Sequence, residues 1–228
     1  MWSARPVVAC KVSRHTALRA DLPGILISER DEMRKDRYAT YVELSRNQIE
    51  GEDYRVTVLR RGSGIAVIAP HGGRIERGTS EVARAIAGDD LDLYLFEGCL
   101  PSLNFETLHL TSRHFDEPRA RALALIAGCH TVLAVHGVAD TGERALLGGR
   151  ESALASMIAD RLFVRGVRAL VSGHRYPGRD AANVCNRGAG GQGVQLELSD
   201  RLRGGPLEPA VVEAVRRALL DRLSASAS

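Results

Sequence analysis

From Tyr54 onward, short apolar runs typical of strands alternate with longer segments of helical periodicity. Such alternation is typical of α/β proteins, in which helices cover the faces of a sheet. Residues 65–69 form a continuous apolar run and residues 131–135 are apolar after Thr131, which indicates strands buried on both faces. Residues 79–87 have the pattern of a helix, with a Ser/Thr start signal and Gly88 just beyond the end. We therefore predict an α/β fold with a mixed, mostly parallel sheet of about seven or eight strands sandwiched between helices.

The other expected elements follow from the same patterns. Strands are expected at residues 54–59, 91–96, 108–111, 169–172 and 194–198, and helices at residues 116–127, 151–165 and 208–223. Loops are expected at residues 98–107 and 178–193, the second of which is rich in Gly and Asn.

The 228 residues suit a single α/β domain, because one hydrophobic core of this size is common. Hydrophobic residues make up 44% and charged residues 26%, which argues against a disordered or collagen-like chain. Residues 1–35 show no sustained periodicity and end in a charged run. We therefore expect residues 1–35 to be a poorly ordered N-terminal extension and residues 36–228 to form one catalytic domain. We also expect the first 32 residues to be dispensable, with Met33 as an alternative start of the chain.

Charge and cysteine usage narrow the class of protein. The net charge is +3, with 31 Lys and Arg against 28 Asp and Glu, which gives nucleic-acid binding little support. The four cysteines are far apart and form no C-x-x-C pair, which argues against a zinc finger and predicts free thiols. No run approaches the roughly 18 apolar residues that span a membrane, and no signal sequence is recognisable. We expect a cytoplasmic monomer that binds neither nucleic acid nor membranes.

Two histidines occupy equivalent positions in the predicted sheet. His71 and His136 each follow a buried strand and precede a glycine, where open α/β sheets place ligand-binding groups. Glu76 lies five residues after His71 and could complete a His/Glu/His set of metal ligands. Such a set leaves one position for water, as in hydrolytic zinc sites. The spacing itself is a weak signal, and the alternative is a pair of ordinary loop or core histidines.

The strand expected at residues 194–198 carries a carboxylate. Alternation places Gln195 and Glu197 on one face of the strand and its apolar residues on the other. A carboxylate in the middle of a strand is unfavourable unless it is paired, hydrated or near a metal. Glu197 is therefore a candidate general base that takes a proton from the attacking water. The alternative is an edge-strand carboxylate that faces solvent.

Several Arg and Asn residues lie in or beside these motifs. Arg187, Arg74 and Arg113 are candidates for binding substrate carboxylates, because Arg forms planar bidentate pairs with them. Asn183 and Asn186 lie just before Arg187, where they could orient an amide group. The alternative is that the arginines are solvated surface residues and the asparagines are turn residues.

Taken together, these segments resemble the poly-γ-glutamate hydrolase family, whose members are also labelled phage-related replication proteins. The resemblance rests on the order and spacing of several runs between about residues 36 and 222. These runs are residues 71–81, 96–98, 108–112, 115–118, 135–137, 147–149, 183–187 and 193–199. One departure is the glycine loop at residues 190–193, which is slightly longer than is usual in the family.

The resemblance implies a fold similar to that of zinc carboxypeptidases, with Zn²⁺ held by His71, Glu76 and His136. It implies hydrolysis of γ-glutamyl amide bonds in poly-γ-glutamate or a related acidic peptide. Analogy with the carboxypeptidases makes Glu197 the base, with Glu97 as the next candidate. The alternatives are a zinc amidase or peptidase that acts on another amide, such as a peptidoglycan fragment, and a non-catalytic replication-associated binding protein. A metal assay separates the hydrolases from a metal-free binding protein.

Overall fold

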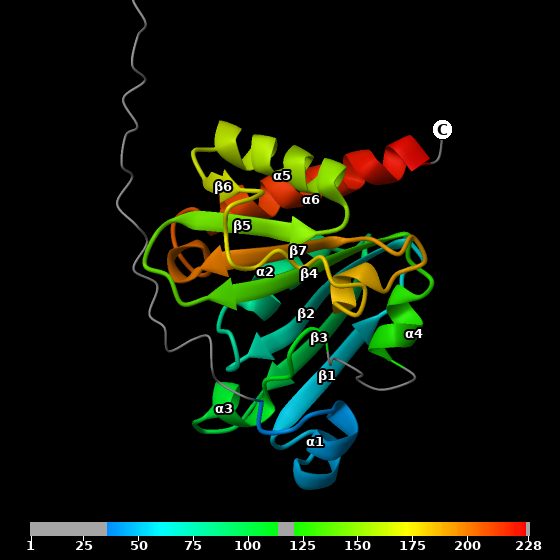
Figure 1. Ribbon diagram of the computed structural model, residues 1–228, viewed down its shortest axis with the longest axis vertical. Helices are drawn as coiled ribbons and strands as arrows, with labels where there is room; N and C mark the ends of the chain where they lie inside the picture. The colour runs from blue at the N-terminus through cyan, green and yellow to red at the C-terminus, as the bar shows by residue number, and fades with distance from the viewer. Residues whose placement is uncertain (1–35, 114–120, 227–228) are drawn as a thin grey trace, which may run out of the picture. The chain divides into compact units, whose positions relative to one another are not determined.

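The computed structural model describes residues 36–113 and 121–226. These residues all belong to one compact unit of the chain, residues 35–228. The expected N-terminal extension, residues 1–35, lies outside the described residues, as does the first part of the helix expected at residues 116–127. Within this unit the chain forms one sheet with helices on both faces (Figure 1).

Seven strands among the described residues form one mixed sheet in the order β1-β3-β2-β4-β7-β5-β6. The strands are β1 Tyr54–Leu59, β2 Ile65–Gly73, β3 Asp92–Gly98, β4 Thr131–Val138, β5 Arg144–Gly149, β6 Arg168–Leu170 and β7 Val194–Ser199. Four of the six neighbouring pairs are parallel, and the pairs β1/β3 and β5/β7 are antiparallel. The expected α/β class and mostly parallel sheet are confirmed.

Two hydrophobic cores lie on the two faces of the sheet. The helices are α1 Tyr41–Asn47, α2 Thr79–Ala87, α3 Asn104–Leu108, α4 Ala122–Ile126, α5 Ser152–Val164 and α6 Glu208–Ser226, with short 3-10 helices η2 Val184–Asn186 and η3 Asp200–Leu202. Helices α2, α5 and α6 pack on one face, which we call the α2/α5/α6 face. Helices α1 and α4 and the short helix η2 pack on the other, which we call the α1/α4 face.

Strand alternation decides which polar side chains meet. In β4, Val135 packs in the core of the α2/α5/α6 face, so the next residue, His136, projects from the α1/α4 face. In β7, Leu196 and Leu198 pack in the same core as Val135, so Glu197 between them also projects from the α1/α4 face. The alternation predicted for this strand is confirmed.

Two central strands extend further than expected. Strand β2 continues through Gly73 and β4 through Val138, so both His-Gly pairs lie inside strands rather than after them. The register of β2 with β3 shifts between Ala69 and Gly72. Such an irregularity changes the direction of the side chains beside it, and it lies at the position of the first histidine.

Several elements differ from the sequence-based prediction. No strand forms at residues 108–111, and helix α3 instead lies within the loop expected at residues 98–107. Strand β5 was not predicted, because the pair Gly148-Gly149 ends its short apolar run and weakens the strand pattern. Pairing with β7 along its length compensates for these glycines.

Helix α2 has the expected bounds but a different start. Its N-cap is Gly78, and no side chain caps the helix. The φ of +88° at Gly78 is a left-handed conformation that favours glycine. The hydroxyl of Thr79 donates instead to the carbonyl oxygen of Glu76 at 2.7 Å. The predicted end at Gly88 is confirmed.

Three of the four cysteines lie in the described residues, and Cys99, Cys129 and Cys185 are free thiols, as expected. Cys10 lies outside the described residues. Burial raises the pKa of Cys185 to about 12, which makes this thiol unreactive. None of the helices that the structure describes is both long and apolar enough to cross a membrane.

Candidate metal centre

The turn after β2 carries Glu76 back toward His71. The backbone N–H of Glu76 donates to the carbonyl oxygen of His71 at 2.9 Å, and the Thr79 hydroxyl contacts the carbonyl oxygens of both residues. Gly72 permits this tight packing, because a Cβ there would lie 2.2 Å from the Ser80 hydroxyl oxygen. The turn therefore joins an imidazole and a carboxylate that are five residues apart.

His71, Glu76 and His136 meet at the carboxyl ends of the neighbouring strands β2 and β4. Nδ1 of His71 lies 2.9 Å from Oε1 of Glu76 and 3.2 Å from Nδ1 of His136. The three ligand atoms lie within 4.8 Å of one another, and His71 and His136 are only 2% and 3% exposed. Two atoms that bind one zinc at about 2.0–2.1 Å in a tetrahedral arrangement lie roughly 3.3 Å apart. The three side chains therefore fit a single metal ion.

The hydrogen bonds of His71 indicate that a cation belongs between these groups. Nε2 of His71 lies 2.7 Å from the carbonyl oxygen of Leu110, which can only accept, so Nε2 carries a proton. Nδ1 then presents a lone pair to Glu76 and His136, unless the ring is doubly protonated. Buried electron-rich atoms in such close contact require a proton or a metal ion between them. Metal-binding histidines commonly donate their other N–H in this way.

The electrostatics of the three residues agree with this conclusion. Burial alone would lower the pKa of His71, but the charge of Glu76 and the hydrogen bond to it outweigh burial and raise this pKa. Burial alone would raise the pKa of Glu76, but His71 holds it well below its usual range. Burial, with the charge of His71, lowers the pKa of His136 to about 3. His136 is therefore neutral, which is the form of imidazole that binds a metal.

Glu197 lies beside the triad on β7, where it pairs in register with His136. The side chain is buried in a central strand, so the alternative of a solvent-facing edge carboxylate does not hold. Nε2 of Gln195 donates to Oε1 of Glu197 at 2.9 Å, and Nδ2 of Asn183 donates to Oε1 of Gln195 at 2.7 Å. Burial and the charge of Glu76 raise the pKa of Glu197. Two buried amides thus hold this carboxylate in one orientation.

Glu97, the other candidate base, lies on the opposite face of the sheet. Leu93 and Leu95 in β3 pack in the core of the α2/α5/α6 face, so Glu97 projects from that face as well. Its carboxylate accepts a hydrogen bond from Arg84 of α2 at 3.1 Å. The sheet therefore separates Glu97 from the triad, and the structure favours Glu197 over Glu97.

His109 is a candidate functional residue to which sequence reasoning assigned no role. Its ring centroid lies 4.1 Å from that of His71 and 4.5 Å from that of Phe105. Nδ1 of His109 lies 2.7 Å from Oδ1 of Asp36, which fixes the ring, and Asp36 also accepts the backbone N–H of Thr111. The only signal in the sequence is that His109 belongs to one of the runs that resemble the family.

Arg203 connects the backbone segments that carry the site. Its side chain is 5% exposed and donates to the carbonyl oxygens of Leu198, Val138 and Arg77. Gly137 makes room for it, because a Cβ there would lie 2.3 Å from Nη1 of Arg203. One guanidinium group therefore joins the ends of β4 and β7 to the turn after β2. These are the segments that bear the triad and the strand carboxylate.

Both predicted asparagines support the walls of the site. Asn186 is buried, and its amide bonds only to backbone groups in the surrounding loops and at the end of β5. Asn183 accepts the backbone N–H of Cys185 and donates to Gln195. These bonds indicate architectural roles, and contact of either asparagine with substrate stays a prediction.

The three predicted arginines have different surroundings. Arg74 is exposed and donates to the carbonyl oxygens of Cys99 and Leu100. The side chain of Arg113 is 58% exposed and lies 3.5 Å from Asp180. Arg187 is half-buried at the end of η2. Their contacts with a substrate carboxylate stay predictions.

The chain is similar in sequence to known proteins over most of the described region. Residues 38–218 match the sequence model of a family described as poly-gamma-glutamate hydrolase. UPF0714 protein YndL of Bacillus subtilis (strain 168) is 36% identical over 171 residues, which are 74% of this chain and 66% of YndL. UPF0714 protein YmaC of the same strain is also 36% identical over 74% of this chain and 71% of its own length. The chain therefore spans slightly less than two thirds of YndL.

Two solved structures have the same fold. One is a bacteriophage poly-γ-glutamate hydrolase, with a TM-score of 0.77 and 31% identity, and the match covers 83% of this chain and 99% of that chain. The other is YndL in a form described as apo and zinc-free, with a TM-score of 0.76 and 32% identity, covering 82% and 99% of the two chains. Sequence and fold lead to the same conclusion: this chain belongs to the poly-γ-glutamate hydrolase family.

Proposed function

We propose that this chain is a zinc-dependent hydrolase that cleaves γ-glutamyl amide bonds in poly-γ-glutamate or a related acidic peptide. The observation that carries the proposal is the buried His/Glu/His triad with Glu197 in register beside His136. Membership of the family and the similarity to the bacteriophage hydrolase support the substrate class. The YndL structure described as zinc-free supports zinc as the metal.

The donor set suits zinc, which binds imidazole nitrogen and carboxylate oxygen and keeps a fourth position open in hydrolases. When bound, a zinc ion polarises an amide carbonyl and lowers the pKa of a water molecule. Nδ1 of His71, Nδ1 of His136 and a carboxylate oxygen of Glu76 would hold it. The Leu110 carbonyl orients the His71 ring, and the backbone N–H of Gly137 donates to Oε2 of Glu76 at 2.7 Å.

Glu197 acts as the general base in this proposal. It accepts a proton from the attacking water and then delivers a proton to the leaving amine, as a positioned carboxylate does in such hydrolyses. Gln195 holds Oε1 of Glu197, and Asn183 in turn holds Gln195. The carboxylate is thereby oriented before substrate binds, which reduces the reorganisation needed during the reaction.

Arginines hold the α-carboxylates of the substrate in this proposal. Arg187, Arg74 and Arg113 are the candidates, because each lies in or beside a loop of the site and Arg binds carboxylates in a bidentate manner. An Arg187→Lys change loses the planar fork, and an unchanged KM for an acidic substrate would remove Arg187 from this set. We further expect a monomer in the cytoplasm, which gel filtration and cell fractionation test.

Metal analysis coupled to a substrate screen tests the proposal. We expect one zinc ion per chain and cleavage of poly-γ-glutamate, measured as new amino groups and shorter polymer. A chelator should abolish both, and added zinc should restore them. An exposed Glu52→Gln variant serves as the control for handling. Cleavage of peptidoglycan fragments alone would contradict the substrate class, and a chain without metal or amidase activity would favour a binding protein.

A further inference from the structure

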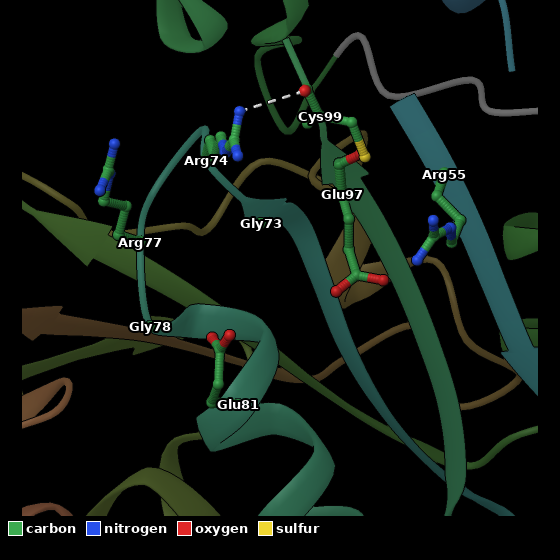
Figure 2. A pocket seen from close by; sticks show the side chains of 9 residues that line it. Arg55, Gly73, Arg74, Arg77, Gly78, Glu81, Glu97 and Cys99 are labelled. Carbon is green, nitrogen blue, oxygen red and sulfur yellow. Dashed lines mark hydrogen bonds between the residues drawn. The ribbon is translucent and has the colours of Figure 1, made fainter. Parts of the chain in front are cut away.

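A pocket lies outside the triad but shares the turn after β2 with it. Its volume is about 420 Å³, which falls within the roughly 300–1,000 Å³ of small-molecule sites. Strands β1 and β3, the turn after β2 and the first turn of α2 form its walls (Figure 2). Its charged lining residues are Arg55, Arg74, Arg77, Glu81 and Glu97.

Positive charge exceeds negative charge in this pocket. Arg74 donates to carbonyl oxygens, which leaves its charge uncompensated. Within the described ranges, neither Arg55 nor Arg77 forms an ion pair. Glu97 already accepts from Arg84 of the neighbouring helix. Only one unpaired carboxylate, that of Glu81, therefore stands against three lining arginines in the described part of the chain.

The arrangement of these groups suits an acidic peptide. Figure 2 shows the carboxylates of Glu81 and Glu97 directed into the pocket and Arg55 turned toward Glu97, with Arg74 and Arg77 at the rim and their guanidinium groups pointing away from the carboxylates. Each unit of a γ-linked glutamate chain carries an α-carboxylate, which pairs with a guanidinium group, and an amide N–H, which donates to a carboxylate. A simple anion such as phosphate would use the arginines and meet repulsion from the two carboxylates.

The pocket also lies close to the triad along the chain. Arg74 and Arg77 line the pocket, and Glu76 between them belongs to the triad. Because consecutive Cα atoms are about 3.8 Å apart, the Cα atoms of Arg74 and Glu76 are at most about 7.6 Å apart. The pocket lies on the α2/α5/α6 face and the triad on the α1/α4 face, so a chain-like substrate would have to cross this turn at the edge of the sheet to occupy both.

We propose that this pocket is a second subsite, which binds the α-carboxylate of a glutamyl unit beyond the bond that is cleaved. The proposal rests on the proposed γ-glutamyl hydrolase function. It adds Arg55 and Arg77, two residues to which the sequence pattern assigned no role, to the groups that recognise the substrate. It also explains how the chain would prefer a polymer over an isolated γ-glutamyl amide.

Two double variants with equal changes of charge test the subsite. Arg55→Gln/Arg77→Gln alters the pocket, whereas Arg168→Gln/Arg217→Gln alters exposed arginines of β6 and α6. Each pair lowers the formal net charge from +3 to +1, so long-range attraction of a polyanion falls equally in both. Both pairs are made in a Glu197→Gln chain, in which turnover is expected to be roughly a hundredfold or more slower. The Kd for poly-γ-glutamate is then measured by equilibrium dialysis.

We expect the pocket pair to raise this Kd roughly tenfold and the control pair to raise it about twofold or less, since the pocket pair removes direct charge-assisted contacts. Equal changes in both pairs would overturn the subsite. Cleavage by the chain with native Glu197 tests the hydrolase function separately. If that chain cleaves nothing but the pocket pair alone weakens binding, the subsite stands without the proposed function. If the chain with native Glu197 cleaves poly-γ-glutamate and the two double variants bind it equally, the hydrolase function stands and the subsite does not.

Discussion

Glu197 in β7 and Glu97 in β3 are both strand carboxylates of the same sheet, but they project from opposite faces and have different partners. Glu197 projects from the α1/α4 face beside His136, and Gln195 orients it. Glu97 projects from the α2/α5/α6 face and pairs with Arg84. The apolar neighbours in each strand determine the face. A strand carboxylate can therefore act at the metal centre only if the residues before and after it in the strand pack in the core of the α2/α5/α6 face.

We expect the greatest loss of activity from removing a metal ligand on the α1/α4 face, the face from which Glu197 projects. His71→Ala or His136→Ala leaves only two protein ligands, too few for a stable open zinc site. We expect loss of bound zinc and of detectable hydrolysis, measured by elemental analysis and an amine-release assay. His130→Ala, at an exposed histidine, is the control. Full zinc occupancy in both ligand variants would show that the assigned ligands are wrong.

A smaller effect is expected from the residue that joins the segments of the site. Arg203→Ala removes the bonds to the carbonyl oxygens of Leu198, Val138 and Arg77. We expect roughly 10- to 100-fold weaker zinc binding, the range typical of residues that orient metal ligands. Competition with a chelator measures it. Arg201→Ala, at a side chain that is 66% exposed, is the matched control, and equal zinc affinities in the two variants would exclude this role.

The orientation of Glu197 by buried amides predicts a further, smaller effect. Asn183→Ala and Gln195→Ala should each lower kcat about tenfold, less than the roughly hundredfold or more expected for loss of the base itself, while zinc stays bound. Because both act through Glu197, the double variant should be little worse than either single variant. Steady-state kinetics on poly-γ-glutamate measure this coupling. Losses that simply multiply would mean that the two residues act independently.

A change at Glu97, on the α2/α5/α6 face, should have the least effect. Glu97→Gln breaks a pair with Arg84, whose side chain is 45% exposed, so unfolding should become easier by only about 0.2–1 kcal/mol. Arg84→Gln should have a similar effect, and chemical denaturation measures both. Loss of bound zinc in the Glu97 variant would contradict the placement of this residue on the far face.

The central strands and the triad could be predicted from the sequence because burial controls both. Continuous apolar runs mark β2 and β4, and alternation in β7 places Glu197 on the correct face. The His-Gly pairs at the ends of two adjacent parallel strands are brought together by the sheet itself. Their meeting depends on β2 and β4 being neighbours, which the sequence pattern does not show.

Other parts of the site could not be predicted because they depend on backbone atoms and on distant contacts. The Leu110 carbonyl bonds to His71 whatever side chain residue 110 carries. Arg203 binds three carbonyl oxygens near the site, and its ion pair with Asp200, three residues earlier, gives no sign of that role. The register shift between Ala69 and Gly72 likewise follows from pairing with β3. Sequence periodicity records none of these contacts.

The most direct test of the account is a Glu197→Gln variant, which keeps the size of the side chain and removes the proton acceptor. Zinc content and kcat on poly-γ-glutamate are measured on the same sample, with Glu52→Gln as the exposed control. We expect full zinc occupancy and a kcat lowered by roughly a hundredfold or more, because the variant lacks the general base. Loss of zinc would make Glu197 a ligand or its support, and full activity would place the base elsewhere.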